Sequence, residues 1–174
     1  MCIFSFINLT PRSIKTSIFL FISLGIWSQT PDCLQLTQQE FDGADCWRAL
    51  AKAGNYEAAA TLQLEFINKG KVRNLTSLYW HVGQLFALDN KIEKAIHYMQ
   101  KTQTVFTKWL GGEEGKTWYY FTKATMAFLQ RDRATFNRIL LKWERKFPKD
   151  KNYIELTRLD KNWELPYRQA TLNS

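Results

Sequence analysis

The feature that most constrains the fold of this chain is a short segment that recurs at a helical spacing. The six residues from Gly54 to Ala59, GNYEAA, align with the six from Asn90 to Ala95, NKIEKA, at an offset of 36 residues. Each copy begins with turn-forming residues and continues into a segment whose apolar residues recur every three or four positions. A repeat of this length predicts stacked units of two helices, because one helix pair cannot bury its apolar face alone.

Helix-start and turn signals divide the rest of the chain in the same way. Thr37 and Glu40 form a capping-box pattern, and Asn74 or Thr76 can cap a later helix. No segment shows sustained alternation of apolar and polar residues, so we expect no strands. The expected helices span 37–53, 56–68, 74–88, 91–110, 116–130, 132–146 and 151–164, and residues 111–115 are predicted to form a linker.

The middle unit carries a family pattern. Tyr79 is followed four residues later by Gly83 and then by Phe86, and Ala95 stands on the second helix. This order of aromatic and small residues resembles the tetratricopeptide repeat, in which small residues let two helices approach closely. The resemblance implies an all-α, antiparallel helix-pair solenoid.

The units on either side match the tetratricopeptide pattern only in part. Tyr120 and Ala124 fit in the third unit, but Phe136 stands where the family has a small residue. In the first unit Trp47 stands where Gly or Ala is expected. The resemblance covers about residues 40–148, and it implies about three helix pairs followed by a C-terminal capping helix.

The N-terminus has the pattern of a secretory signal. Arg12 and Lys15 precede an apolar run over 18–27, which is too short for the roughly 20 residues that span a bilayer. We expect a signal peptide over 1–28, cleaved after Ser28, and a periplasmic or secreted protein without stable membrane insertion. An uncleaved N-terminal anchor is the alternative. The expected parts that follow are an extended leader over 29–36, a helical domain over 37–166 and a flexible tail over 167–174.

Two cysteines remain after removal of such a signal, Cys33 and Cys46. In an oxidising compartment we expect them to form a disulfide that ties the leader to the first helix. Closing this loop would stabilise the fold by about 3 kcal/mol in the chain-entropy model. Two free, buried thiols are the alternative.

Composition and motifs bear on function mainly by exclusion. The chain has a net charge of +8, which suits an acidic partner, nucleic acid or an anionic membrane, but it has no run of five basic residues. An exported protein seldom meets nucleic acid, so we expect none as a partner. The sequence lacks the H-E-x-x-H, G-x-S-x-G and phosphate-loop patterns, and its histidines are His81 and His97. We therefore expect no enzyme activity, no cofactor and no metal.

The resemblance also implies where a partner would bind, because the first helix of each tetratricopeptide pair lines a concave groove. Trp80 and Phe121 stand out, since each follows an aromatic that packing already requires; core packing of these rings is the alternative. The implied groove residues are Asp45, Arg48, Lys52, Trp80, His81, Gln84, Trp118, Phe121, Thr125 and Phe128. The family's clamp for a C-terminal carboxylate needs Lys and Asn where Ala44 and Arg48 stand, so that mode is not expected.

The sequence thus favours an exported interaction module that binds a protein or peptide in a concave groove, and its basic charge suits an acidic partner. It leaves the oligomeric state open. Two alternatives have the same sequence support. One is an immunity or inhibitor protein against an envelope-targeted toxin. The other is a scaffold in envelope assembly or nutrient uptake.

Overall fold

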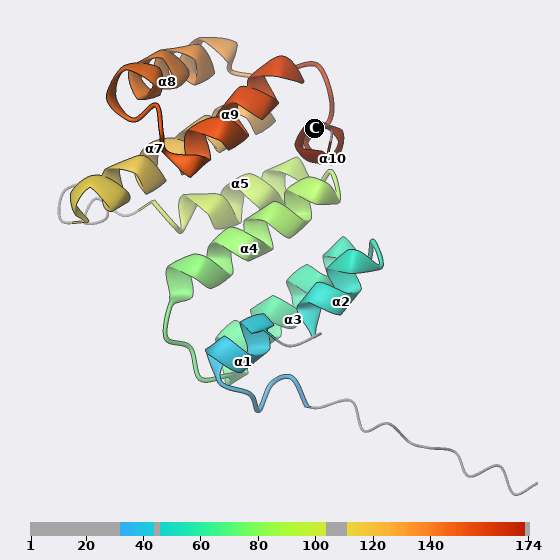
Figure 1. The fold of residues 1–174 in the computed structure, drawn as a ribbon. Coiled ribbons are helices and arrows are strands. Elements are labelled where there is room, and N and C mark those ends of the chain that lie inside the picture. Colours follow the sequence, from blue (N-terminus) through green and yellow to red (C-terminus); the bar gives the residue numbers. More distant parts are fainter. Residues whose placement is uncertain (1–31, 44–45, 104–110, 173–174) are drawn as a thin grey trace, which may run out of the picture. The chain divides into compact units, whose positions relative to one another are not determined.

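The computed structural model describes residues 32–43, 46–103 and 111–172, and in these ranges it is all-helical without strands. A single isolated bridge pairs Thr37 with Lys71. The helices follow one another along the chain, as Figure 1 shows. They are α1 (Gln38–Gly43), α2 (Trp47–Lys52), α3 (Tyr56–Lys69), α4 (Leu75–Leu88), α5 (Ile92–Gln100), α7 (Gly112–Leu129), α8 (Arg133–Lys146), α9 (Lys151–Lys161) and α10 (Tyr167–Leu172).

The turns within the three helix pairs share one geometry. Gly54, Asn90 and Arg131 follow α2, α4 and α7, and each has a positive φ, of 82°, 57° and 60° respectively. At each turn this residue donates to the carbonyl three residues back, and the next residue donates to the carbonyl five residues back. This is the Schellman motif, in which a left-handed residue satisfies the last carbonyls of a helix. The pairs α2–α3, α4–α5 and α7–α8 are therefore built on the same joint.

The helix caps that the sequence predicts at Thr37 and Asn74 are confirmed. Glu40 accepts from the backbone nitrogen of Thr37 at 2.8 Å, and Thr37 Oγ1 accepts from the nitrogen of Glu40 at 3.4 Å. Asn74 caps α4 by accepting from the backbone nitrogen of Ser77 at 3.0 Å. Asp132 and Asp150 cap α8 and α9 in the same way. Each cap satisfies a backbone donor that has no partner inside its helix.

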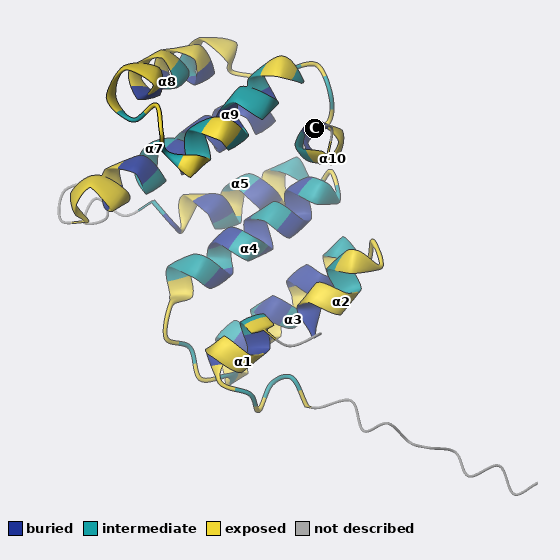
Figure 2. Cartoon of the chain, viewed as in Figure 1, coloured by how far each residue is buried: buried dark blue, intermediate teal, exposed yellow. Residues whose placement is uncertain are grey.

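Gly83 lets α4 and α5 touch. A Cβ added at Gly83 would lie 2.6 Å from Met99 Cγ and 3.1 Å from the carbonyl oxygen of Ala95. Gly83, Ala95 and Met99 are all buried. Contacts otherwise run mainly between helices close together in the chain, with one exception, in which α10 packs on both α9 and α4. Figure 2 shows that buried residues follow the inner faces of α4 and α7.

Two predicted helix boundaries are wrong. One lies at Gly43, between α1 and α2, and the other is the C-terminal end of α5. The helix expected over 37–53 is instead two, α1 and α2; Gly43 ends the first, and Cys46 has a ψ of −96° at the start of the second. Glycine is a poor helix former, which favours a break there. The helix expected to reach residue 110 ends at Gln100, where Thr102 and Gln103 donate three residues back instead of four. Residues 104–110 lie outside the described ranges.

The glycine-rich segment 111–115 is also not the predicted linker, since α7 begins at Gly112. Glu113 and Glu114 occupy the first turn of this helix. Carboxylates are favourable there, because the helix dipole places partial positive charge at the N-terminus. The acids offset the low helix propensity of the glycines beside them.

The C-terminal segment is not the predicted flexible tail. The expected last helix ends at Lys161, and residues 167–172 form α10, in which Tyr167 and Ala170 are buried. Ala170 donates to the carbonyl of Pro166, so the proline stands just before the first turn of α10. Proline suits that position, because it lacks only a donor that the helix would leave unpaired.

Cys33 and Cys46 lie at disulfide-bond distance, with their sulfur atoms 2.06 Å apart, as the sequence predicts. The predicted signal peptide over 1–28 falls outside the described residues, as do residues 29–31 of the leader. Among the helices that the structure describes, none is both long enough and apolar enough to cross a membrane.

Candidate binding cavity

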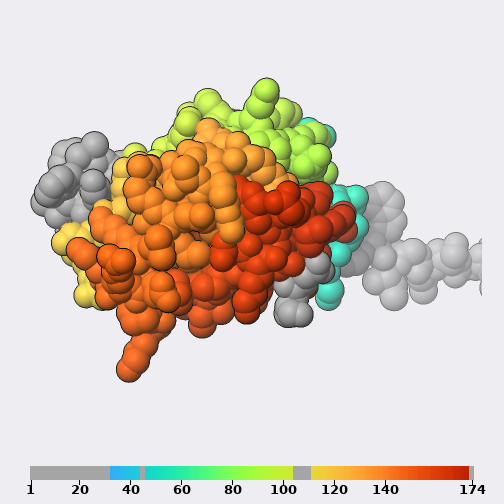
Figure 3. All heavy atoms as spheres, turned by 90° about the horizontal axis from the view of Figure 1, so that it is seen from above, coloured from blue at the N-terminus to red at the C-terminus, as the bar shows by residue number. Residues whose placement is uncertain are grey.

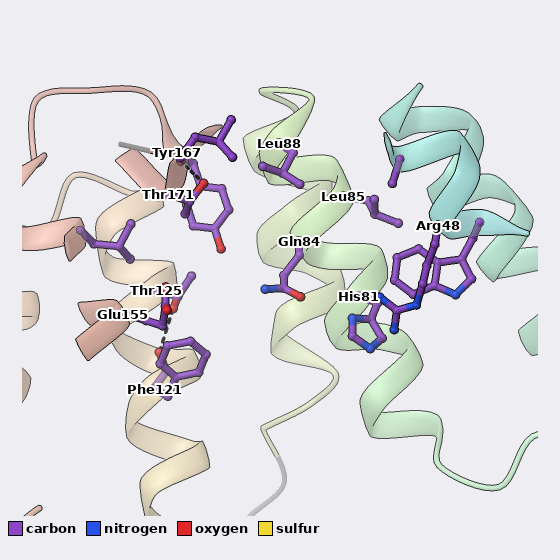
Figure 4. A pocket seen from close by; sticks show the side chains of 14 residues that line it. Arg48, His81, Gln84, Leu85, Leu88, Phe121, Thr125, Glu155, Tyr167 and Thr171 are labelled. Atoms are coloured by element: carbon purple, nitrogen blue, oxygen red, sulfur yellow. Dashed lines mark hydrogen bonds between the residues drawn. The ribbon is translucent and has the colours of Figure 1, made fainter. Parts of the chain in front are cut away.

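A cavity of about 430 Å³ lies among α2, α4, α7, α9 and α10. Figure 4 shows α4 facing α7, α9 and α10 across it, with α2 beside α4. Its lining residues are Trp47, Arg48, Ala51, His81, Gln84, Leu85, Leu88, Phe121, Thr125, Glu155, Leu159, Tyr167, Thr171 and Leu172. The volume is within the range of about 300–1,000 Å³ that is common for ligand pockets.

Most of the cavity wall is apolar or aromatic. Leu85 and Leu88 come from α4, Phe121 from α7 and Leu159 from α9. Phe121 is positioned by Trp80, whose ring centroid lies 5.3 Å from its own. Such a wall offers favourable burial to an apolar group of a partner, at about 25 cal/mol for each Å² removed from water.

Arg48 supplies a fixed positive charge at the cavity. Its Nε donates to the backbone carbonyl of Asp42, and its guanidinium lies 4.2 Å from the centroid of the Trp47 ring. Neither contact neutralises the charge, and none of the described carboxylates forms an ion pair with Arg48. Arginine held in this way is well suited to bind a carboxylate, because its remaining N–H donors are already oriented.

His81 lies beside Arg48 and is kept neutral by its surroundings. Its ring centroid lies 5.1 Å from that of Trp47. Burial is the largest effect and lowers the pKa of His81 below 6.5; Arg48 also lowers it, while Asp42 and Gln84 act in the opposite direction. A neutral imidazole presents one donor and one acceptor near pH 7.

Tyr167 lies on the opposite wall. Burial raises the pKa of its hydroxyl to about 12, against a smaller lowering by a side-chain hydrogen bond with Gln84. Figure 4 shows the side chains of Gln84, on α4, and Tyr167, on α10, both directed into the cavity. The hydroxyl stays protonated over the whole physiological range.

Glu155 is the acid of the cavity. Its carboxylate pairs with Arg158 at 3.0 Å, and Arg158 also donates to the carbonyl of Thr171 at 3.4 Å. This arginine links α9 to α10. Glu155 and Arg48 lie on opposite walls in Figure 4. Arg158 offsets the charge of Glu155, so Arg48 is the charge of the cavity that lacks a described ion-pair partner.

The structure brings half of the predicted groove residues together. Arg48, His81, Gln84, Phe121 and Thr125 all line the cavity. Asp45 is outside the described residues. The other four predicted residues do not line this cavity; they are Lys52, Trp80, Trp118 and Phe128.

Trp80 and Phe128 are core residues, which corrects the expectation that they line the groove. Trp80 is 5% exposed and packs edge-on against Trp118, with ring centroids 5.0 Å apart. Phe128 is 1% exposed and packs against Trp163. Trp80 precedes His81 by one residue, and adjacent helical side chains point about 100° apart, so the two cannot face the same space. Lys52 is exposed near the end of α2.

Sequence reasoning missed the wall formed by α9 and α10. Leu159, Tyr167 and Leu172 belong to segments expected to cap the array or to be a tail. Pro166 followed by apolar Tyr167 and Ala170, three residues apart, is a helix-start signal that identifies α10. Trp47 was also missed, because the family pattern has a small residue there.

The described residues contain no group of three or more His, Cys, Asp or Glu side chains placed to hold a metal ion. Comparison with known proteins gives no match for this chain, whether among family models, curated protein sequences or solved structures.

Proposed function

We propose that this chain is an exported interaction module that binds a segment of a protein or peptide in the cavity between α4 and α10. The observation that carries the proposal is an apolar cavity beside an arginine, Arg48, that forms no ion pair with any described carboxylate. The wall would accept a large apolar side chain, and Arg48 would bind a nearby carboxylate. The occupant is therefore an acidic segment with an apolar anchor.

The helix pairs support a tetratricopeptide-like reading of the module. The three intra-pair turns share one hydrogen-bond pattern, and Gly83 lies against α5 as that family's small residues do. α2, α4 and α7, the first helices of the pairs, all contribute to the cavity. In such arrays the first helices line the binding surface.

Export is supported by the Cys33–Cys46 pair, since disulfides persist in oxidising compartments. The signal pattern over 1–28 agrees with this. N-terminal sequencing of the chain recovered from outside the cytoplasm tests export. A start at Gln29 is expected, and an intact Met1 would contradict cleavage.

Filling the cavity tests the proposed binding site. Ala51 lines the cavity on α2, whereas Ala49 on the same helix is exposed and does not. Peptides are selected from a random displayed library on the wild-type chain, and their affinities are then measured for Ala51→Trp and Ala49→Trp. We expect Ala51→Trp to weaken binding at least tenfold, since its indole occupies the partner's volume, and Ala49→Trp to change it less than about twofold. Equal affinity of both variants would overturn the proposal.

A second pair of variants tests the acid preference. Arg48→Glu and Lys52→Glu make the same change of charge on α2, but only Arg48 lines the cavity. Selected peptides rich in Asp or Glu should lose binding to Arg48→Glu alone. Circular dichroism of each variant checks that the helices remain folded.

A further inference from the structure

The positive charge of the chain is concentrated in one short stretch. From Asp32 onward the chain carries 22 basic and 16 acidic residues. Between Arg131 and Lys151 alone there are eight basic residues and three acidic ones, so this stretch holds a net +5 of the total +6. No run of five basic residues marks it in the sequence, because α8 spaces the cations along a helix.

The helix places these cations on one face. Counted from Arg138, the other outer residues of α8 lie three, four, seven and eight positions further along the chain. This is the spacing of a single helical face. The opposite face is buried through Phe136, Ile139 and Trp143. Figure 2 shows the outer side of α8 as exposed. We call this the α8 outer face: Arg138, Leu141, Lys142, Arg145 and Lys146.

The cations of the α8 outer face are not neutralised by the protein. Arg138 donates to Thr135 Oγ1 at 3.0 Å and Lys142 to the Tyr120 hydroxyl, both of which are uncharged partners. No described carboxylate forms an ion pair with any of the four. Some cations outside this face are paired, as Arg133 is with Asp160 at 2.7 Å. The only acid of α8 is Glu144, which the helical offset places to the side of this face.

Leu141 decides between the polyanions that such a face could meet. Its side chain is 55% exposed in the middle of the four cations. An exposed leucine gains nothing from phosphates of nucleic acid in water, but it can enter the boundary between headgroups and acyl chains of a bilayer. A cysteine pair at disulfide distance also favours a compartment with little nucleic acid. Figure 3 shows the orange atoms of α8 at the surface of the folded domain.

We propose that the α8 outer face docks the protein on an anionic phospholipid surface, with Arg138, Lys142, Arg145 and Lys146 among the headgroups and Leu141 at their acyl boundary. We propose a peripheral association with the membrane surface, since no described helix is long and apolar enough to span a membrane. α8 lines no part of the cavity, so docking leaves the cavity free for its partner. The inference goes beyond the proposed peptide binding and does not depend on it.

Vesicle co-sedimentation of the exported chain tests the docking. The probe is vesicles of phosphatidylglycerol and phosphatidylcholine in equal amounts, beside vesicles of phosphatidylcholine alone. We expect binding only to the first, weakening steeply as salt is raised. The double variant Arg145→Gln/Lys146→Gln should lower the partition coefficient roughly twentyfold, at about fivefold for each cation near an anionic surface. Leu141→Ser should lower it severalfold at every salt concentration.

The matched control is Lys52→Gln/Lys69→Gln, which removes the same charge at two exposed sites on α2 and α3. It should change the partition coefficient less than about threefold. Equal losses in both double variants would overturn the proposal, because net charge alone would then explain binding. Binding to double-stranded DNA that depends on Arg145 and Lys146, without vesicle binding, would overturn it as well and assign the face to nucleic acid. Thermal melts check that each variant is folded.

Discussion

The middle helix pair, α4–α5, and the third pair, α7–α8, share a turn but pack differently. Seven residues before the left-handed turn residue the middle pair has Gly83, and the third has Ala124. Five residues after it the middle pair has Ala95, and the third has Phe136. In the middle pair the small residues bring the backbones of α4 and α5 together. In the third pair the Phe136 ring packs between Phe128 and Trp163.

Both solutions are fully buried. Ala95 and Phe136 have no exposed surface, and the Phe136 ring lies 5.1 Å from that of Trp163 and 6.4 Å from that of Phe128. The comparison teaches that the turn fixes how two helices are joined, while the side chains decide how close they come. A small residue at the position of Ala95 and Phe136 is therefore one way to pack two paired helices, and a large aromatic residue is another.

The largest effect on stability should come from removing the buried aromatic side chain of the third pair. Phe136→Ala is expected to lower the free energy of unfolding by about 4 kcal/mol, because it removes buried apolar surface and leaves a cavity. Urea titration followed by circular dichroism measures the change. Leu141→Ala on the same helix is the control, since Leu141 is 55% exposed, and it should stay within about 0.5 kcal/mol of wild type. A loss below about 1 kcal/mol for Phe136→Ala would mean that the ring does not fill the joint.

Overfilling the close joint should cost somewhat less. Gly83→Val puts atoms against Met99 Cγ and the Ala95 carbonyl, and we expect the free energy of unfolding to fall by about 3 kcal/mol. Gly43→Val makes the same substitution where nothing lies within 4 Å of the new Cβ. The same urea titration compares the two. If both variants were equally stable, α4 and α5 would not be in contact at Gly83.

The smallest effect concerns the residue after the turn, which is Asp132 in the third pair and Lys91 in the middle pair. Asp132 caps α8, whereas Lys91 makes no cap bond and pairs with Glu57 and Asp89. Asp132→Ala should lower the melting temperature by a few degrees at pH 7, since a helix donor loses its partner. Lys91→Ala should lower it less, because exposed ion pairs contribute little.

The cap should also give a pH dependence of known sign. The backbone and side chain of Thr135 lower the pKa of Asp132 below 3.8 by hydrogen bonding to the carboxylate. A depressed folded pKa means that the cap stabilises the fold above the unfolded value and is lost as pH falls through the folded value. The difference in melting temperature between wild type and Asp132→Ala should therefore shrink below pH 4. A difference that stays constant to pH 2 would contradict a role for the ionised carboxylate.

Local signals in the sequence predicted much of the fold. Thr37 with Glu40, and Asn74, were identified as caps, because these caps depend only on residues three positions apart. The boundaries that failed lie at Gly43, where a glycine disfavours the helix, and after Gln100, where the backbone donors bond three residues back instead of four. α7 begins at Gly112, where Glu113 and Glu114 in the first turn favour the helix. The prediction of a linker considered only the glycines and not these two acids.

The site was predicted on one wall and missed on the other. Arg48, His81 and Gln84 follow from the position of a groove in a helix-pair array, and they do line the cavity. Trp80 does not, because its face is covered by Trp118 and Phe121. Whether an aromatic on a first helix faces a groove or a neighbouring unit depends on the stagger between units, and that stagger has no local signature.

The sequence by itself determined most of the helices, several of their caps and the turns that join them in pairs, because these rest on interactions over a few residues. It also brought out the cysteine pair and the apolar periodicity. Only the tertiary structure decided that α10 returns to α4 and lines the cavity, and that Arg138, Lys142, Arg145 and Lys146 form one face without a described ion-pair partner. Both depend on contacts between segments far apart in the chain. The energies of these contacts are shared among many side chains, so no single sequence motif predicts them.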